Sequence, residues 1–529
     1  MVEQAWALSD GQRAETVTRI TQSIANLAFS QGWSIDDAEA QETATQVEKK
    51  AYTVAQVESR TTTGIRPHSD SLKAYTRNLA NLVLAAAKGQ PKAQEQPMAQ
   101  ENGGEANAAE LDLTGEREFL TRDSAQEALA PMLAPGSAIT EIKLSTKSFG
   151  RDAAEVASQA IANLSKSLVS VDMSDVIAGR PEAEALDALR IMSNALSRLQ
   201  LRLLDLSDNA LGEKGVRACA AAIESQTGLQ ELAFQNVGCS IRACQAVGEL
   251  VKHPQELRRL HLYNNMSDDA GAAAIAEVLQ KAPRMADFRM ASSRVGAEGG
   301  IALAEGLAAG SELQRLDLSD NPMTEEVAPA LAQALRQQTG LVRLNLNDTS
   351  LQDEGISAIA EALPANILEL ELALNEVTPE GAHALAAALS RLPHLQRLNL
   401  RENELENEGA IAIAKGLSGL KNLRELDLTQ NQIGRMGAMA IGKAVAACSS
   451  LQKLELDENQ VSEDGVSHLK SILTAAGQEH VLGSLEENDP DADEELDDGD
   501  EGDEAENEDG LGDAADDLAD ALSKQAQIK

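Results

Sequence analysis

Leucine and asparagine recur along most of the chain in one fixed pattern, and its clearest copy runs from Leu423 to Ile433. In that copy leucines alternate with polar residues, which predicts a short strand with its leucines buried. The asparagine Asn431 follows the strand, where its amide can bond backbone groups of the turn. This position returns every 28 residues, with one spacing of 26, at Asn209, Val237, Asn265, Ser293, Asn321, Thr349, Asn375, Asn403, Asn431 and Asn459.

Behind each turn the pattern changes to a helical period. A glycine is followed by an alanine-rich run in which large apolar residues stand four apart, so that both lie on one helix face. The clearest pairs are Ile359 and Leu363, Leu385 and Leu389, Ile413 and Leu417, and Ile441 and Val445.

A unit of one strand and one helix cannot bury its apolar side alone, so successive copies must stack. The sequence therefore predicts an α/β fold, a leucine-rich-repeat solenoid of the ribonuclease-inhibitor-like type. Its parallel strands line the inside and its helices the outside. The first recognisable strands are 139–144 and 168–173, and the spacing then stretches around the segment 175–181, an insertion of the kind that often marks a binding face.

The rest of the chain divides by composition. Residues 1–87 show apolar positions at helical spacing and predict a small all-α domain. Residues 88–109 are rich in Gln, Glu, Gly and Pro and predict a flexible linker. The repeats are assigned to 110–484, and 485–529 is expected to be a disordered acidic tail.

The charge balance is strongly acidic. The chain has 85 Asp or Glu against 45 Lys or Arg, a formal net charge of −40, and residues 485–529 hold twenty acidic residues against two lysines. Such a chain is repelled by nucleic acid and by anionic membrane surfaces, and it suits a basic protein partner. No apolar run approaches the ~18 residues of a membrane span, so we expect no membrane insertion.

The sequence carries no enzyme motif. We find no Gly-rich phosphate loop ending in Lys-Ser or Lys-Thr, no His-Glu-x-x-His and no Gly-x-Ser-x-Gly. The four cysteines lack the paired spacing of a zinc site, so we expect no metal and a reducing compartment. His261 alone falls at an inner-surface position, where a contact with a partner is the expected role. If the protein takes part in a reaction, it should act on the active site of a partner.

One repeat departs from the pattern. In the copy at 229–238 the asparagine position is Val237, and an asparagine, Asn236, stands one place earlier, where its side chain can face outward. The next copy has asparagine at both places, Asn264 and Asn265. An exposed amide on a rigid solenoid can orient a side chain of a docked protein, but register slippage of the ladder asparagine explains the pattern equally well.

At these residues the sequence resembles the Ran GTPase-activating proteins, most closely the plant-type members. The stretch 174–180 looks like the signature loop of that family with its arginine, Arg180. The pair Gln235 and Asn236 falls where the family has its catalytic asparagine. The stretches 262–271 and 288–300 also resemble plant-type copies.

The resemblance implies a non-enzymatic activator of the GTPase Ran in its GTP-bound form, with a role in nucleocytoplasmic transport. Asn236 would order the active site that Ran supplies, and Arg180 would brace the loop and Asn236; the opposing interpretation makes Arg180 an arginine finger. The protein itself would need no cofactor, because nucleotide and Mg²⁺ belong to the GTPase. Contacts with Ran are expected from Asp208, Asn209, Gln235, Asn264 and Asn265.

The N-terminal segment resembles the WPP domain, which in plants docks on nuclear-envelope coiled-coil proteins. The defining Trp-Pro-Pro reads Trp6-Ala7-Leu8 here, so the fold is expected and the targeting is not assured. The expected location is cytoplasmic, including the outer nuclear envelope. The competing hypothesis is a non-catalytic scaffold or inhibitor that holds a basic partner against inner-face acids, with Asp317, Glu371, Asp427 and Glu455 as candidates.

Overall fold

The chain divides into two compact units, Met1–Glu105 and Ala106–Lys529. The structure is a computed structural model. In the second unit it describes residues 109–490 and 492, and in the first it describes Arg13, Val17, Gln41, 43–45, Glu48 and Lys49. The predicted helical domain, the linker before residue 109 and the acidic tail after residue 492 therefore lie outside the described residues.

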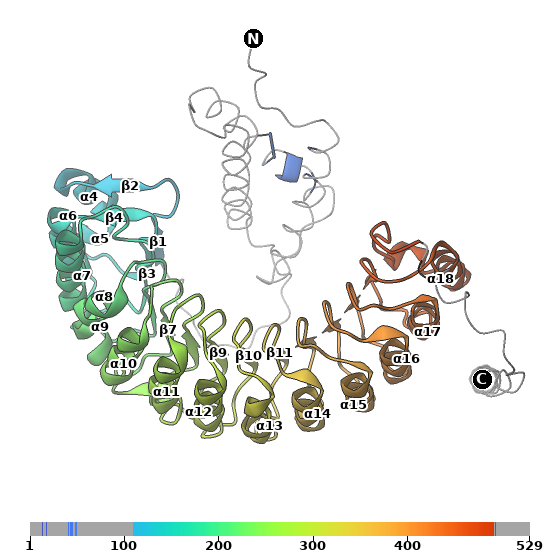
Figure 1. The fold of residues 1–529 in the computed structure, drawn as a ribbon. Coiled ribbons are helices and arrows are strands. Elements are labelled where there is room, and N and C mark those ends of the chain that lie inside the picture. Colours follow the sequence, from blue (N-terminus) through green and yellow to red (C-terminus); the bar gives the residue numbers. More distant parts are fainter. Residues whose placement is uncertain are drawn as a thin grey trace, which may run out of the picture. The chain divides into compact units, whose positions relative to one another are not determined.

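Short parallel strands form the inner layer of the second unit (Figure 1). Within the described residues thirteen strands join one sheet in the order β1-β3-β5-β6 and then consecutively to β15, while β2 and β4 form a separate pair. The strands of the large sheet are β1 (Ala109–Asp112), β3 (Ile139–Lys143), β5 (Ser170–Asp172), β6 (Leu203–Asp205), β7 (Glu231–Ala233), β8 (Arg259–His261), β9 (Asp287–Arg289), β10 (Arg315–Asp317), β11 (Arg343–Asn345), β12 (Glu369–Glu371), β13 (Arg397–Asn399), β14 (Glu425–Asp427) and β15 (Lys453–Glu455). The separate pair is β2 (Glu118–Leu120) and β4 (Lys147–Phe149).

Helices form the outer layer, and from α6 onward most repeats carry one of about three turns (Figure 1). The helices are α4 (Arg122–Ala128), α5 (Ala130–Leu133), α6 (Arg151–Asn163), α7 (Glu182–Leu196), α8 (Gly212–Ala218), α9 (Ala220–Glu224), α10 (Ile241–Leu250), α11 (Asp268–Leu279), α12 (Ala297–Leu307), α13 (Ala328–Leu335), α14 (Gln352–Ala362), α15 (Pro379–Leu389), α16 (Glu406–Leu417), α17 (Arg435–Val445) and α18 (Glu463–Ala475). The 3-10 turns are η1 (Pro254–Glu256), η2 (Glu325–Val327) and η3 (Glu479–Val481).

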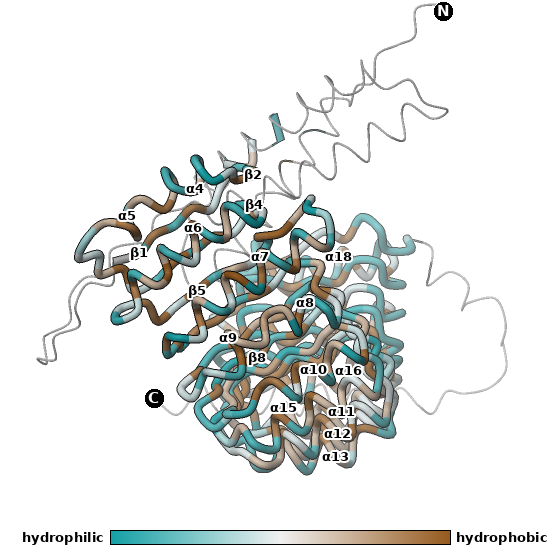
Figure 2. Tube along the Cα trace, turned by 90° about the vertical axis from the view of Figure 1, so that its left-hand side faces the viewer, coloured by the Kyte–Doolittle hydropathy of each residue, from teal (hydrophilic) through white to brown (hydrophobic). Residues whose placement is uncertain are grey.

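The core runs continuously between the two layers. The strand leucines and the paired apolar residues of the helices are buried, as their spacing predicted; Leu426 is 1% exposed and Ile413 is fully buried. Figure 2 shows apolar segments alternating with polar turns along the chain. The leucine-rich-repeat solenoid is therefore confirmed. Among the described residues, no helix combines the length and apolar character needed to cross a membrane.

The ladder asparagines hold neighbouring turns together. Asn321 accepts the N–H groups of Ser293 and Val295 at 3.0 Å each, and its amide group donates to the carbonyls of Met290, Leu318 and Ser319. The Asn321 amide thus makes its hydrogen bonds entirely inside the protein.

The repeat structure begins at the expected boundary and continues a little beyond the other expected end. The strand β1, which the leucine pattern did not predict, pairs in parallel with β3. At the other end Asn488, placed in the acidic tail by its sequence, continues the ladder by accepting the N–H of Asn459 at 3.0 Å. It also donates to the carbonyl of Leu456. The tail boundary therefore moves past residue 488, because an acidic neighbourhood does not prevent one asparagine from closing the last turn.

Side chains of one helix also cap the next helix. Asp353 in α14 accepts the N–H groups of Thr378 and Gly381, which belong to the first turn of α15 and its cap. Asn407 in α16 does the same for Gly434 and Gly437 of α17. Because unpaired N–H groups at a helix start are costly to bury, these contacts fix the position of each helix against its neighbour.

Candidate functional site

Each turn that leaves a strand from β5 to β15 places one residue in the left-handed conformation, one position before the ladder. The φ angle of these residues lies between 48° and 59°. Their N–H groups bond the carbonyl of the next turn, as Asp208 does to Gln235 at 2.8 Å and Asn236 to Tyr263 at 3.1 Å. We call them the rim column: Asp175, Asp208, Asn236, Asn264, Ser292, Asp320, Asp348, Leu374, Glu402, Gln430 and Glu458.

Asn236 belongs to this column and not to the buried ladder. Its side chain is exposed, as its position one place before Val237 suggested. Asn and Asp tolerate the left-handed conformation better than most residues, so the backbone alone favours an asparagine at this turn. Any role of Asn236 toward a partner therefore depends on the groups that surround it.

A row of side-chain hydrogen bonds fixes the Asn236 amide. Its Nδ2 donates to Asp208 Oδ1 at 3.1 Å, and its Oδ1 accepts from Asn264 Nδ2 at 3.2 Å. All three side chains are exposed, so the row lies on the surface of the rim. A docked protein would meet an amide whose orientation is already set by both neighbours.

Val237 stands at the ladder position directly beneath this row, so this turn lacks the side-chain amide that most other turns have. The backbone compensates, because the Val237 carbonyl accepts the N–H groups of Leu211 and Gly212 at 3.0 and 3.1 Å. Val237 itself is fully buried. The departure from the pattern is therefore accommodated by the fold, and register slippage does not explain Asn236.

Two of the expected partner contacts need correction. Asn209 and Asn265 are ladder residues, 1% and 6% exposed, and their amides are bonded to the backbone. They hold turns together and have no free group to offer a partner. Asp208 and Asn264 are exposed and Gln235 is half-buried beside His261, so these three remain candidates for contact.

Arg180 is tied into the protein by its whole guanidinium group. Nε donates to Ser148 Oγ at 3.0 Å, Nη2 to the carbonyls of Ser148 and Leu120 at 2.7 and 3.1 Å, and Nη1 to Glu184 at 3.3 Å. The group also lies over the ring of Phe119, 5.3 Å from its centre. The Arg180 side chain is only 16% exposed.

None of these contacts reaches Asn236. Arg180 follows β5 and Asn236 follows β7, so two strand spacings, about 10 Å, separate their turns. Among the described residues the partners of Arg180 belong to β2, β4, α7 and their flanks, and Asn236 is not among them. The expectation that Arg180 braces Asn236 directly is therefore wrong; Arg180 instead anchors its own loop to the preceding repeats.

At the acidic end of the row, burial raises the pKa of two carboxyl groups. Asp175 pairs with Arg117 at 2.5 Å and lies one turn before Asp208. Burial raises the pKa of the Asp175 carboxyl, and the charge of Arg117 only partly offsets this effect. Burial also raises the pKa of Asp205 at the end of β6.

A groove with a volume of about 530 Å³ lies beside Asn236 on the rim. We call it the rim groove; its lining residues are Asn236, Gly238, Asn264, Asn265, Met266, Ser292, Arg294, Asp320 and Pro322. Met266 is 46% exposed, which is unusual for a large apolar side chain in this structure. The sequence did not single out this groove, because its walls come from four successive repeats.

On the inner face, His261 belongs to a cluster of charged residues around Asp287. Its Nε2 lies 3.0 Å from Asp287 Oδ1, and Arg259 and Arg315 each approach Asp287 to 3.4 Å. Burial would raise the pKa of Asp287, but the hydrogen bond and charge of His261 and the neighbouring arginines lower it to about 2. This cluster ties three strands together.

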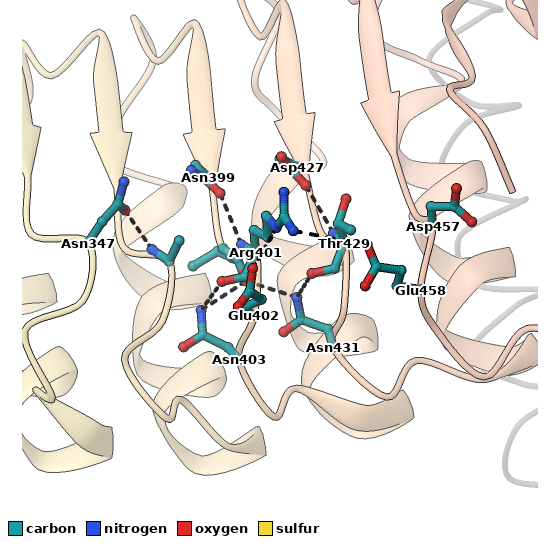
Figure 3. Close-up of polar contacts among 12 residues, drawn as sticks. Asn347, Asn399, Arg401, Glu402, Asn403, Asp427, Thr429, Asn431, Asp457 and Glu458 are labelled. Carbon is teal, nitrogen blue, oxygen red and sulfur yellow. Dashed lines mark hydrogen bonds and ion pairs between the residues drawn. The ribbon is translucent and has the colours of Figure 1, made fainter. Parts of the chain in front are cut away.

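The inner face of the last repeats is acidic. Asp317, Glu371, Asp427 and Glu455 end β10, β12, β14 and β15 and lie partly exposed, as predicted. Figure 3 shows the turns that follow the last strands: Asn403 and Asn431 donate to backbone carbonyls, and Asp427 accepts the N–H of Thr429. Arg401 pairs with Glu402 and approaches Glu458 to 4.0 Å. Burial raises the pKa of Glu371, partly offset by a hydrogen bond from Asn399.

In the part of the chain that the structure describes, no three His, Cys, Asp or Glu side chains gather as metal ligands. The strongest candidate for a partner site is therefore the rim around Asn236, with its fixed amide row and the adjoining groove.

Comparison with known proteins supports this organisation. A model of the WPP domain matches residues 4–97, and a leucine-rich-repeat model matches residues 201–218, 339–360, 364–386, 391–414 and 419–442. RAN GTPase-activating proteins 1 and 2 of Arabidopsis thaliana are 38% and 41% identical over 165 residues, 31% of this chain and 30% of each relative. The resemblance to plant-type proteins of this kind, with a WPP domain and leucine-rich repeats, is therefore confirmed, over about a third of the chain.

Among solved structures, an internalin from Listeria monocytogenes aligns with 63% of this chain and 78% of its own. The TM-score is 0.40 and the sequence identity 16%.

Proposed function

We propose that this protein stimulates GTP hydrolysis on a Ran-type small GTPase. Its chain joins a WPP domain to leucine-rich repeats and resembles the RAN GTPase-activating proteins of Arabidopsis. The observation that carries the proposal is the Asn236 amide, exposed on the rim and fixed between Asp208 and Asn264. The protein supplies this group, and the GTPase supplies the nucleotide, its Mg²⁺ and the attacking water.

The proposed mechanism is positional. A rigid amide offers one donor and one acceptor at set positions, so it can hold a side chain of the GTPase in the orientation that places the water. Ordering of this kind lowers the barrier without a charge from the activator, whereas an arginine finger stabilises developing charge directly. The intramolecular bonds of Arg180 support the first route, because a finger needs a free guanidinium group.

Single-turnover hydrolysis of GTP preloaded on Ran, with this protein in catalytic amounts, tests the proposal. Replacing Asn236 with alanine should lower the stimulated rate by about 100-fold or more, the usual loss when one preorganised group is removed. The matched control is Gln430→Ala, because Gln430 is another exposed amide of the rim column, with φ 58°, seven repeats away. Its stimulation should equal that of the wild type.

The Arg180→Ala variant separates the two mechanisms. If Arg180 braces its loop, the variant should lose thermal stability together with part of its activity. A loss of activity as large as that of Asn236→Ala at unchanged stability would instead make Arg180 the finger. Absence of stimulation by the wild-type protein would refute the function itself.

A second function, stoichiometric capture of a basic protein, is favoured by the acidic inner face of the last repeats. The same assay distinguishes it. An activator works at substoichiometric amounts, whereas an inhibitor or scaffold requires one copy for each partner molecule.

We further propose that the N-terminal domain docks on nuclear-envelope coiled-coil proteins, so that a cytoplasmic protein gathers at the outer nuclear envelope. The matched WPP model supports this proposal. The motif Trp6-Ala7-Leu8 lacks the two prolines that would stiffen it. Fluorescence imaging of the full chain and of the Ala7→Pro, Leu8→Pro double variant tests it: rim staining that strengthens in the variant is expected, and no rim staining in either refutes the docking.

A further inference from the structure

The longest uncharged stretch of the rim column includes Asn236. In the rim column, Asp175 and Asp208 precede Asn236, and acids return from Asp320 onward; between them stand only the uncharged Asn236, Asn264 and Ser292. The residues one place after each ladder position form a second column, which has no acid before Glu376: Ile177, Ala210, Gly238, Met266, Arg294, Pro322, Ser350, Glu376, Glu404, Gln432 and Gln460. Within this second column Arg294 is the one cation.

Arg294 is exposed, and the protein gives it no partner among the described residues. Other arginines of the same rim are paired, as Arg117 is with Asp175 and Arg401 with Glu402. Asp320 lines the same groove, yet no ion pair joins it to Arg294 within 4.0 Å. An unpaired guanidinium group in a chain of net charge −40 is therefore available for an external anion.

The groove around Arg294 has both an apolar and a polar wall. Met266, 46% exposed, stands one repeat before Arg294, and the amide of Asn264 opens into the same space. A half-exposed methionine offers a soft contact surface for a partner. Together these groups suit a protein segment that carries one carboxylate beside an apolar side chain.

We propose that the rim groove binds a segment of the GTPase next to its nucleotide site, and that Arg294 pairs with an acidic side chain of that segment. This inference rests on the proposed function. Arg294 lies two strand spacings, about 10 Å, from the turn of Asn236, so it would contact a residue flanking the reaction site. Asp320 in the groove disfavours a multiply charged phosphate, and a single carboxylate fits the local charge better.

The pair would fix the orientation of the bound GTPase. Acids of the rim column stand on both sides of the groove, at Asp208 and at Asp320 and Asp348, and they repel a carboxylate there. The docked register that brings the carboxylate to Arg294 is therefore favoured over its neighbours. Arg294 is then a specificity residue, and Asn236 remains the group that acts on the active site.

The test measures single-turnover hydrolysis on Ran-GTP over a range of activator concentrations, which gives a half-saturating concentration and a maximal rate. Replacing Arg294 with alanine should raise the half-saturating concentration about 10-fold, and Arg294→Glu by 100-fold or more, while the maximal rate stays within about twofold. Arg336→Ala is the matched control, because Arg336 is exposed and unpaired among the described residues but lies at the end of α13 in the outer layer. Thermal melting of each variant verifies folding.

Charge reversal on the partner completes the test. Replacing surface acids of the GTPase near its nucleotide, one at a time, with lysine should identify one position that restores tight binding to Arg294→Glu. A lowered maximal rate at unchanged half-saturation would mean that Arg294 acts on the nucleotide, and unchanged values of both would remove its role; either result overturns the proposal. If the wild-type protein does not stimulate hydrolysis, the proposed function is refuted. If the wild type is active, the role of Arg294 is judged from the difference between the Arg294 variants and the wild type.

Discussion

At the scale of single residues, adjacent positions in one turn have opposite roles. The ladder asparagine is buried and its amide is used up by the backbone, while the residue just before it is left-handed and exposed. Asn264 and Asn265 illustrate the difference within one dipeptide, because only Asn264 reaches the surface. At these turns, contacts with a partner can therefore come from the rim column and not from the buried ladder.

The ladder itself should carry much of the stability. Replacing Asn321, which is 2% exposed, with alanine leaves two N–H groups and three carbonyls without their bonds. We expect a loss of about 2–4 kcal/mol in the free energy of unfolding, since buried polar groups without partners are costly. Urea unfolding measures it, with the rim variant Gln430→Ala as control; equal stability of the two variants would mean that water replaces the lost bonds.

Asp287 should contribute a pH-dependent part of the stability. Because its pKa falls to about 2 in the folded protein, the folded state binds fewer protons than the unfolded chain above that pH. The contribution, about 2 kcal/mol, is complete above pH ~4 and is lost as the pH falls toward 2. Asp287→Asn should therefore destabilise the protein at pH 7, and the difference from wild type should shrink between pH 4 and pH 2.

Chemical denaturation at a series of pH values measures this difference. Glu361→Gln, an exposed helix position, is the control and should stay within about 0.5 kcal/mol of wild type. A constant difference between Asp287→Asn and wild type from pH 7 to pH 2 would contradict the assigned role of the charge.

At the scale of elements, glycines set how closely neighbouring helices pack. A Cβ atom at Gly416 in α16 would lie 2.7 Å from the carbonyl oxygen of Ala386 in α15, and one at Gly306 in α12 would lie 2.8 Å from that of Ala276 in α11. Both neighbours are backbone atoms, which cannot move aside as a flexible side chain can. The close approach therefore requires glycine, although alanine is the better helix former.

Gly416→Ala should lower the free energy of unfolding by about 1–3 kcal/mol, as overpacking usually does. The matched control is Gly419→Ala, because a Cβ atom there meets nothing within 4 Å. That variant should be neutral or slightly stabilising, and thermal melting compares the two. A higher melting temperature for Gly416→Ala would show that helix propensity outweighs packing at this contact.

The sequence predicts the elements of each repeat better than the contacts between repeats. Strands and helices of the repeats follow from short periods that recur at fixed spacing, so the solenoid and its buried leucines were predictable. The strand β1 was missed because it precedes the first complete repeat. Asn236 was found because it breaks the period. The groove with Met266 and Arg294, and the Asp287 cluster, depend on side chains 26 to 28 residues apart that meet only when repeats stack. Comparing residues column by column would have shown Arg294 as the exception.

At the scale of the whole molecule, negative charge is concentrated in two parts of the chain, the last repeats and residues 485–529. The last repeats carry acids on the inner face, and residues 485–529 add twenty acidic residues against two lysines. Long-range attraction from such a charge mainly raises the rate at which a basic partner arrives, and salt screens it. The groove and the amide row act after arrival, over a few ångströms, and the uncharged amide row should depend least on salt.

Removing residues 491–529 separates these contributions while keeping Asn488, which closes the ladder. The truncated protein should associate with Ran-GTP roughly threefold to tenfold more slowly at low ionic strength, and the two rates should converge at high salt. The maximal hydrolysis rate should not change, because the residues proposed to act on the partner, Asn236 and its neighbours, belong to the repeats. Stopped-flow association measures the rates, and a tail of equal length with Asn and Gln in place of its acids is the control. If the truncated and neutralised proteins matched the wild type at low salt, the folded repeats alone would attract the partner.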